Sequence, residues 1–262
     1  MSIYFCPHCK GSVKISDEYS EKLFCSACDA FYPIKQGIPV FEKNISQSME
    51  GYWEAVAPCD ILEPYLLEFL PKDRTFENVL DLGSGEGRAT AVIVTVATKN
   101  VIAVDTSFNS LLRLNEHLLP RVFPVNADAK QLPFPDNYFD LVISLSMVEH
   151  IPYDELKIVF LEVFRSLKKE GIFLVRNDAW FYGVLEKLRI RPGQFGRKPD
   201  ETHINMMTGQ RFRHLLEETG FTIVKENHFP FYRYEKKYGF VMPLIIQRIF
   251  ATHSNFVCNP KK

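Results

Sequence analysis

Short apolar runs recur through residues 76–262 and alternate with amphipathic segments. The runs expected to form strands are 78–83, 100–105, 121–128, 139–145, 171–178 and 221–226. Apolar residues at helical spacing fill intervals between them, for example at 156–169 and at 209–220. Strands that alternate with helices predict an α/β fold with a doubly wound, mostly parallel sheet. Such sheets bind ligands beyond the carboxyl ends of their strands, so those ends are where candidate chemistry is expected.

Residues 1–43 lack this alternation and contain two C-x-x-C pairs. Cys6 and Cys9 form the first pair, and Cys25 and Cys28 form the second pair after fifteen intervening residues. Two such turns can place four thiolates around one ion in a tetrahedron. Metal binding also supplies folding free energy that so short a segment cannot obtain from a hydrophobic core. A redox disulfide would call for a strand–helix–strand setting, which these pairs lack. The spacing therefore predicts a zinc ribbon with a structural Zn²⁺, and leaves iron in the same ligand set open.

Length and charge limit the possible functions. The 262 residues suit one α/β domain at 76–262, joined to the ribbon by a linker and N-terminal helices at 44–75, where a helical pattern runs to about Leu70. A net charge of −1 excludes a uniformly polybasic nucleic-acid binder. The sequence shows neither a secretory leader nor an apolar stretch of bilayer length, so a cytoplasmic protein without a membrane span is expected. Cys59 and Cys258 are expected to be small buried residues.

The first of the strand-like runs leads into a glycine-rich turn. Gly83, Gly85 and Gly87 are spaced G-x-G-x-G. Dinucleotide-binding turns are spaced G-x-G-x-x-G and would have glycine where Arg88 stands. Asp105 ends the second run, where its carboxylate can accept hydrogen bonds from both hydroxyls of a ribose. The turn therefore favours a nucleoside ligand and leaves a dinucleotide open.

Further motifs follow in order along the chain. Asp128 is expected to end the third strand and to accept a hydrogen bond from an adenine amino group. The motifs are LDLGSGEG (80–87), AVD (103–105), NADAKQLPFPDNYFD (126–140) and SMVEHI (146–151). Together they resemble the class I S-adenosylmethionine-dependent methyltransferases of the type 11 group, over about residues 76–176. This resemblance implies a seven-stranded, Rossmann-like α/β sheet and S-adenosylmethionine as the cofactor.

The resemblance also implies roles for individual residues. The implied cofactor contacts are Asp81, Gly83, Ser84 and Gly85 at the methionine end, Asp105 at the ribose, Thr106 near the adenine, Asp128 and Ala129 at the adenine edge, and Ser144 at the sulfonium. A carboxylate that tethers the loop is the alternative for Asp81.

The cysteine-rich segment resembles a second group of proteins. Its sequence CPHCKGSVKI (6–15), together with LFCSACDAFYPIKQGIPVF (23–41), is similar to small zinc-ribbon proteins that bind and activate RNA and protein methyltransferases. It also resembles ribbons fused ahead of bacterial methyltransferase domains. This second resemblance implies that a ribbon over 1–43 works with a methyltransferase.

Methyl transfer needs little from the protein besides a well-positioned acceptor. A base helps only when the acceptor must lose a proton, and His150 is the candidate because histidine titrates near neutral pH. The alternative is that Glu149 and His150 cap the next helix. Tyr153, Tyr182 and His203 are weaker candidates.

An insertion at about 177–208 is expected to set acceptor choice. It contains Trp180, Phe181 and Tyr182 and a basic run at 186–198 with a net charge of +4, and residues 231–262 add a net charge of +5. Aromatic and cationic residues suit an anionic small-molecule, glycan or lipid-linked acceptor. A ribosomal RNA base is the alternative, although the ribbon has as many acidic residues as lysines. A non-catalytic adaptor is a third hypothesis.

Overall fold

The computed structural model describes residues 3–16, 21–42, 68–116, 121–145, 147–188, 202–229, 238–239, 241–251 and 253–262. The chain forms two compact units, one of Met1–Ile143 with Arg165–Gly171 and one of Ser144–Phe164 with Ile172–Lys262. Most of the expected linker and N-terminal helices lies outside the described residues, and so do Cys59 and most of the basic run at 186–198. Residues 68–75 are described and contain no helix, so the helical pattern expected to reach Leu70 is wrong at that end.

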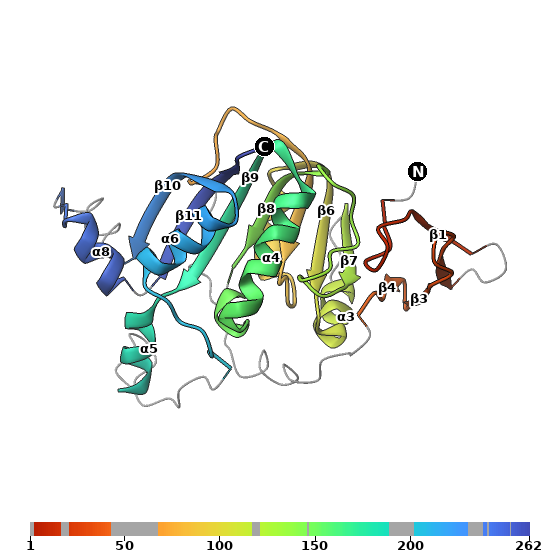
Figure 1. Cartoon of the computed structure of the whole chain (residues 1–262), viewed down its shortest axis with the longest axis horizontal. Helices are drawn as coiled ribbons and strands as arrows, with labels where there is room; N and C mark the ends of the chain where they lie inside the picture. Colours follow the sequence, from red (N-terminus) through yellow and green to blue (C-terminus); the bar gives the residue numbers. More distant parts are fainter. Residues whose placement is uncertain are drawn as a thin grey trace. The chain divides into compact units, whose positions relative to one another are not determined.

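The described strands of the larger sheet number seven and lie in the order β10-β11-β9-β8-β5-β6-β7 (Figure 1). Their bounds are β5 Phe76–Leu82, β6 Ala97–Asp105, β7 Val122–Asn126, β8 Phe139–Ser144, β9 Leu167–Asp178, β10 Phe221–Phe229 and β11 His253–Pro260. β6 pairs in parallel with β5 and β7, and β5 also pairs in parallel with β8. β11 runs antiparallel to β9 and β10. The predicted doubly wound, mostly parallel seven-stranded sheet is therefore confirmed.

The described helices follow the expected periodicity. Their bounds are α2 Arg88–Ile93, α3 Phe108–Glu116, α4 Tyr153–Ser166, α5 Trp180–Lys187, α6 Gly209–Glu218 and α8 Leu244–Phe250, with a single 3₁₀ turn, η2, at Val148–His150. In α4 the residues spaced three and four apart, Leu156, Val159, Phe160 and Val163, are all fully buried. Helix α6 begins at the N-cap Thr208, whose hydroxyl accepts from the Arg211 amide.

Some strand boundaries and one whole strand differ from the sequence-based expectation. β9 begins at Leu167, four residues before the expected strand, because the preceding helix ends at Ser166 rather than at Lys169. β7 ends at Asn126, so the expectation that Asp128 ends this strand is wrong; Asp128 lies in the turn that follows. β11 was not expected as a strand because polar residues interrupt its apolar pattern.

The polar residues of β11 have buried partners across the sheet. Asn255 Nδ2 donates to Asn227 Oδ1 of β10 at 2.9 Å, and Asn255 Oδ1 accepts from Arg176 Nε of β9 at 3.0 Å. Ser254 Oγ lies 2.8 Å from His228 Nδ1. Because these polar side chains are paired with one another, a strand rich in polar residues can lie buried between β9 and β10. No local sequence pattern could indicate this, since the partners lie in other strands.

The ribbon is a four-stranded antiparallel sheet in the order β1-β2-β3-β4. Its strands are β1 Val13–Ile15, β2 Lys22–Cys25, β3 Phe31–Lys35 and β4 Ile38–Pro39. Within the first compact unit the ribbon packs beside β7 (Figure 1). Val40 forms a parallel bridge with Asn126, and the Phe41 amide donates to the Asn126 carbonyl at 2.8 Å. The ribbon thus continues the edge of the larger sheet.

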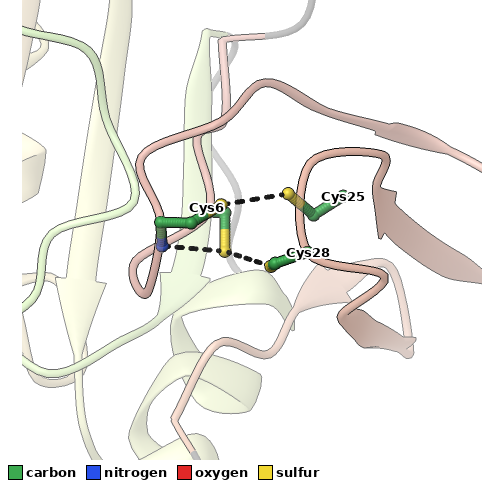
Figure 2. A group of neighbouring side chains, drawn as sticks. Cys6, Cys25 and Cys28 are labelled. Carbon is green, nitrogen blue, oxygen red and sulfur yellow. Dashed lines mark hydrogen bonds between the residues drawn. The ribbon is translucent and has the colours of Figure 1, made fainter.

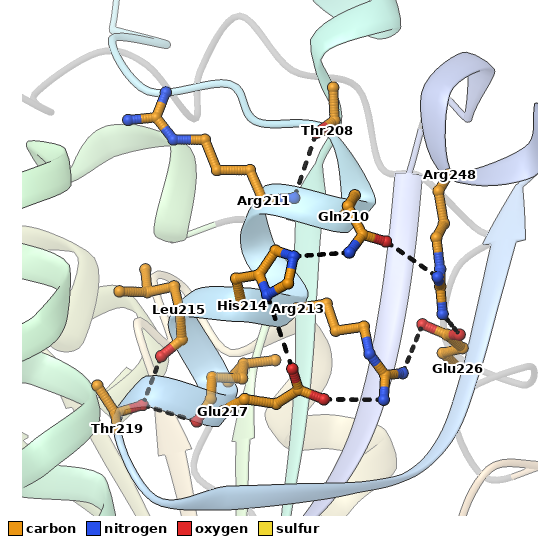
Figure 3. A network of polar contacts seen from close by, with 11 residues as sticks. Thr208, Gln210, Arg211, Arg213, His214, Leu215, Glu217, Thr219, Glu226 and Arg248 are labelled. Carbon is orange, nitrogen blue, oxygen red and sulfur yellow. Dashed lines mark hydrogen bonds and ion pairs between the residues drawn. The ribbon is translucent and has the colours of Figure 1, made fainter. Parts of the chain in front are cut away.

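Arg248, one of the basic residues near the C-terminus, is held in a polar network on α6, α8 and β10 (Figure 3). Its guanidinium pairs with Glu226 and donates to Gln210 Oε1 at 2.9 Å. Arg213 of α6 binds Glu226 at 3.3 Å and Glu217 at 2.9 Å. Arg248 is therefore an internal ion-pair partner rather than an outward-facing cation of the C-terminal basic segment.

None of the helices in the described residues has the length and apolar character that crossing a membrane would require. Cys258 is fully buried, as expected, and burial raises the pKa of its thiol.

Candidate functional site

The glycine-rich turn connects β5 to α2 in left-handed backbone. Gly83, Gly85 and Gly87 have φ values of +79°, +51° and +87°. The amides of Gly83 and Ser84 donate to the Val104 carbonyl of β6 at 2.9 and 3.0 Å. A Cβ at Gly87 would lie 2.2 Å from Leu114 Cδ1 of α3, so close packing of the turn also calls for glycine there. The turn is fixed against β6 at the edge where a ligand is expected.

Asp105 at the end of β6 ties two loops together. Its Oδ2 accepts from the Gly85 amide at 2.8 Å, and its Oδ1 accepts from the Ser107 amide at 2.8 Å. Burial raises the pKa of this carboxyl, and the backbone donors at Ser107, Gly85 and Thr106 oppose the rise. The carboxylate is thereby held in one orientation at the strand end, with further lone pairs for a ligand.

Asp81 on β5 is 1% exposed and accepts from Thr90 Oγ1 of α2 at 2.6 Å. Burial raises its pKa to about 7; the Thr90 hydrogen bond opposes this, and the negative charge of Asp105 adds to it. The contact with Thr90 is the one that the loop-tethering alternative calls for. Two buried carboxyls with raised pKa values on neighbouring strands are typical of a functional site.

The third strand end supports the same region. Asn126 at the end of β7 is fully buried, and its Nδ2 donates to the carbonyls of Asp105 at 3.1 Å and Thr106 at 2.9 Å. Asp128 Oδ1 accepts from the Lys130 amide at 2.8 Å. Ala129 beside it is buried. Sequence reasoning missed Asn126, whose importance depends on contacts with a loop twenty residues away.

The residues of this first unit fit S-adenosylmethionine. Ser84 Oγ is buried and has no hydrogen-bond partner among the described residues, as expected of an atom that serves a ligand. Asp105 is followed by Thr106 at the end of β6, and Asp128 by Ala129 in the turn after β7, where a ribose and an adenine would be held. The buried carboxyl of Asp81 suits the cationic methionine end of the cofactor. These assignments remain predictions.

The second compact unit contains the remaining candidates. Ser144 is fully buried at the end of β8, with its Oγ 3.8 Å from Met147 Sδ. His150 ends the 3₁₀ turn η2, and α4 begins only at Tyr153. The Tyr153 ring is covered by the Arg211 guanidinium, 4.1 Å from the ring centroid.

His150 belongs to a cluster with Glu149 and His203. One ligand atom from each lies within 4.8 Å of the other two, and the two imidazole centroids are 5.0 Å apart. His150 Nδ1 lies 3.1 Å from the Thr202 carbonyl. The Glu149 carbonyl accepts from the amides of Ile204 and its neighbour Asn205, both at 3.0 Å. Sequence reasoning named both histidines but not Glu149 as their partner, because His203 lies more than fifty residues away in the chain.

Aromatic rings continue from this cluster. Tyr182 of α5 has its ring centroid 6.2 Å from that of His203 and 5.1 Å from that of His253. Phe229 stacks edge-on against His253 at 5.8 Å, and Trp180 is 45% exposed. Tyr182 is itself buried, so contact with the planar or apolar part of a small molecule falls to the partly exposed rings of His203, Phe229 and His253.

The four cysteines of the ribbon converge (Figure 2). Their Sγ atoms lie within 4.8 Å of one another, with Cys6 to Cys28 at 3.6 Å and Cys9 to Cys25 at 3.5 Å. A tetrahedron with Zn–S bonds near 2.3 Å requires sulfurs about 3.8 Å apart. A Cβ at Gly11 would lie 2.8 Å from Ala27 Cβ and 3.3 Å from two of the sulfurs, so glycine leaves room for the cluster. The donor set and its spacing fit a zinc ion.

The pKa values of the cysteine thiols also favour a cation in this cluster, and the Tyr32 hydroxyl contributes to one of them. Burial raises the pKa of the Cys6 thiol, but hydrogen bonds outweigh burial and lower it to about 6; the Tyr32 hydroxyl, 2.9 Å away, makes the strongest of them. The Cys28 pKa is raised to about 12: the Ala30 amide lowers it, and the thiols of Cys9, Cys6 and Cys25 together with burial outweigh that amide. Neighbouring thiols resist joint ionisation without a cation, which is the condition that zinc relieves.

Comparison with known proteins identifies the family. The family described as "Methyltransferase domain" matches residues 80–175, which span β5 to most of β9. An uncharacterized methyltransferase of Synechocystis is 31% identical over 155 residues, covering 58% of this chain and 69% of that protein. The chain belongs to the methyltransferase family.

Other members of the methyltransferase family match in part. Sterol 24-C-methyltransferase of Aspergillus fumigatus is 34% identical over 124 residues, 44% of this chain. The chain spans only 32% of that protein, and about half of two mycobacterial relatives. Among solved structures, a chain of the complex between the Haloferax volcanii Trm112 methyltransferase activator and a methyltransferase matches with a TM-score of 0.57 and 14% identity, covering 76% of this chain and 88% of that one. A likeness at this identity shows the fold alone.

Proposed function

We propose that this protein is an S-adenosylmethionine-dependent methyltransferase acting on a small-molecule, glycan or lipid-linked acceptor. The observation that carries the proposal is the bond from the Gly85 amide to Asp105 Oδ2, which joins the glycine turn to the end of the neighbouring strand. This contact makes one rigid site from the two motifs that resemble the family's cofactor motifs. Membership of the methyltransferase family supports the same activity.

The bound cofactor would supply a methyl group already activated by a sulfonium. The protein's task is then to orient it: Asp105 accepts from the ribose, the Asp128–Ala129 turn holds the adenine, and Asp81 attracts the positively charged methionine end. The acceptor atom would then form a bond to the methyl carbon as the bond from sulfur to that carbon breaks. Holding the two partners in line can supply several kcal/mol, up to about 7–11 in favourable cases.

His150 is proposed as the base for an acceptor that must lose a proton. Its Nδ1 faces the Thr202 carbonyl, so the hydrogen on this ring is best placed on Nδ1 and the lone pair on Nε2. Ser144, six residues earlier, is proposed to lie at the sulfonium. The contact with Thr202 supports this role for His150 over the alternative, in which Glu149 and His150 cap the following helix.

The acceptor class rests on the rings around Tyr182 and on a relative named for a sterol. A flat or apolar acceptor suits these rings better than a large nucleic-acid surface. An anionic group on the acceptor remains an inference from basic residues at 189–198 and 231–237, which lie outside the described residues. Arg248 does not contribute to it because Glu226 neutralises it.

The ribbon is proposed to hold one structural Zn²⁺ through Cys6, Cys9, Cys25 and Cys28, and to serve as a structural or interaction module. The backbone contacts of Val40 and Phe41 with Asn126 attach it to the end of β7. The structural match to a chain from the complex that contains the Haloferax volcanii Trm112 methyltransferase activator shows the fold alone. The expected metal content is one zinc per ribbon.

The activity is tested with full-length protein, methyl-labelled S-adenosylmethionine and a cell extract separated into RNA, protein, lipid and small-molecule fractions. We expect label in the lipid or small-molecule fraction, and none when Asp105→Ala replaces the wild type. Label in RNA would transfer the proposal to the ribosomal alternative. A chain that fails to bind the cofactor at all would support the adaptor hypothesis.

A further inference from the structure

We propose that Glu149, His150 and His203 bind one divalent cation of the zinc type, at a site separate from the ribbon. The three residues lie in the second compact unit and supply one carboxylate and two imidazoles. This proposal goes beyond methyl transfer and does not rest on it, since an ion can bind whether or not the chain transfers a methyl group.

The ligand atoms are already gathered. All three lie within 4.8 Å of one another, a spacing from which small side-chain rotations reach metal–ligand bonds of about 2.0–2.2 Å. His150 and His203 present their rings at an interplanar angle of 57° with centroids 5.0 Å apart, so the rings are tilted toward each other rather than stacked. Tilted rings can direct one nitrogen each toward a common point.

The backbone holds the two halves of the cluster together. Glu149 and His150 lie on η2, and His203 lies on the segment before α6. The Glu149 carbonyl binds the amides of Ile204 and Asn205, and Asn205 Nδ2 donates to the Ile151 carbonyl at 2.9 Å. These bonds fix the two residues that follow His203 against η2 and the residue after it. A site built on such locked backbone needs little rearrangement to accept an ion.

His150 makes the hydrogen-bond contact to a carbonyl that metal-binding histidines usually make with the nitrogen that does not bind the metal. A ligating imidazole commonly donates its other ring N–H to a carbonyl or carboxylate, which fixes its tautomer. The Thr202 carbonyl lies 3.1 Å from His150 Nδ1 and leaves Nε2 as the ligand atom. The carbonyl comes from the residue next to His203, so the same short segment supplies a ligand and the support of another ligand.

The burial of Glu149 favours a cation. Its side chain is fully buried, and a carboxylate is costly to bury unless positive charge or hydrogen-bond donors compensate it. An ion shared with two imidazoles would add positive charge beside this carboxylate. Two histidines and one glutamate are the ligand set of one class of zinc enzymes, and three protein ligands leave a coordination position open.

The open coordination position determines which group of the acceptor the ion would bind. An oxygen of the acceptor, as a hydroxyl, phenolate or carboxylate, could bind there, and the ion would lower the pKa of a bound hydroxyl. His150 would then act as a ligand, and the ion would replace it as the group that eases loss of the acceptor proton, which would pass to solvent. An ion at this site would select acceptors with an oxygen beside the methylated atom.

The test measures metal binding by the full-length chain without cofactor. The metal-free chain is first loaded with one equivalent of zinc, which the four thiolates of the ribbon bind first, and Co²⁺ is then titrated with detection by absorption and by metal analysis. We expect one further ion per chain, with a spectrum that lacks the thiolate-to-cobalt charge-transfer bands of a cysteine site. Glu149→Gln and His203→Ala should each weaken this binding by more than about tenfold.

His214→Ala is the matched control because His214 is an exposed histidine on α6, outside the cluster. It should bind Co²⁺ as the wild type does. A wild-type stoichiometry of the ribbon ion alone would overturn the proposal, as would a second ion bound equally by both cluster variants. The wild-type titration decides whether the second ion binds, even if a variant fails to fold. A wild-type chain that binds Co²⁺ but transfers no methyl group would count against the proposed function and not against the metal site.

Discussion

The glycine turn and the Glu149–His150–His203 cluster are assembled in different ways. The turn and its partner Asp105 come from adjacent elements, β5, α2 and β6, and their contacts span about twenty residues. The cluster joins η2 to a segment more than fifty residues later through hydrogen bonds between backbone groups. The first arrangement can be recognised from a local motif, and the second cannot. The match to the methyltransferase family covers the glycine turn, Asp105, Glu149 and His150, and it ends before His203.

Removal of the His150 imidazole should separate the roles of the glycine turn and of the cluster most clearly. His150→Ala should lower the rate of methyl transfer by about 100-fold or more, because a base or a metal ligand is lost, while cofactor affinity stays unchanged. Steady-state kinetics and cofactor titration measure the two quantities, with His214→Ala as the control. A parallel fall in cofactor affinity would show that the two regions are not independent.

The buried carboxyl of Asp81 predicts a pH effect on stability in the cofactor-free protein. Its folded pKa of about 7 exceeds an unfolded value near 4, so the folded chain binds more protons between these values. The free energy of unfolding should therefore fall as pH rises from about 4 to 7, by up to roughly 4 kcal/mol. Chemical denaturation across this range should show a flatter profile for Asp81→Asn. An identical profile for the variant would contradict the raised pKa.

Asn126 links the ribbon edge to the cofactor side. Asn126→Ala removes two buried hydrogen bonds to the carbonyls of Asp105 and Thr106, worth about 0.5–1.5 kcal/mol each. Cofactor affinity measured by calorimetry should fall several-fold to about tenfold. Asn100→Ala is the control, because Asn100 makes its hydrogen bond to Asn78 of β5 away from the glycine turn. Equal effects of the two variants on cofactor affinity would show that Asn126 has no specific role in the cofactor site.

The smallest effect is expected from zinc removal. Chelation should unfold residues 1–43, because four thiolates at such spacing repel one another without the ion. Cofactor affinity should change by no more than about threefold, since Asp105, Asp81 and the glycine turn belong to elements beyond the ribbon. Circular dichroism and cofactor titration measure the two outcomes. A complete loss of cofactor binding would show that the ribbon shapes the pocket directly.

The sequence predicted most of the fold because apolar periodicity reports which residues are buried on a strand or a helix. It failed at β11, whose buried Ser254 and Asn255 depend on partners in other strands. Asp105 and the cysteines could be found because their function requires a fixed spacing or a strand end. Asn126 and Glu149 could not, because a buried amide and a buried carboxylate gain their meaning from loops that are distant in the chain.

The central claim is that Asp105 and the glycine turn bind S-adenosylmethionine. Its most direct test is a calorimetric titration of the full-length wild type and Asp105→Ala with this cofactor. We expect one cofactor bound per wild-type chain and an affinity at least about tenfold weaker in the variant, since hydrogen bonds to a charged group are lost. Equal affinity in the two proteins, or no binding by the wild type, would contradict it.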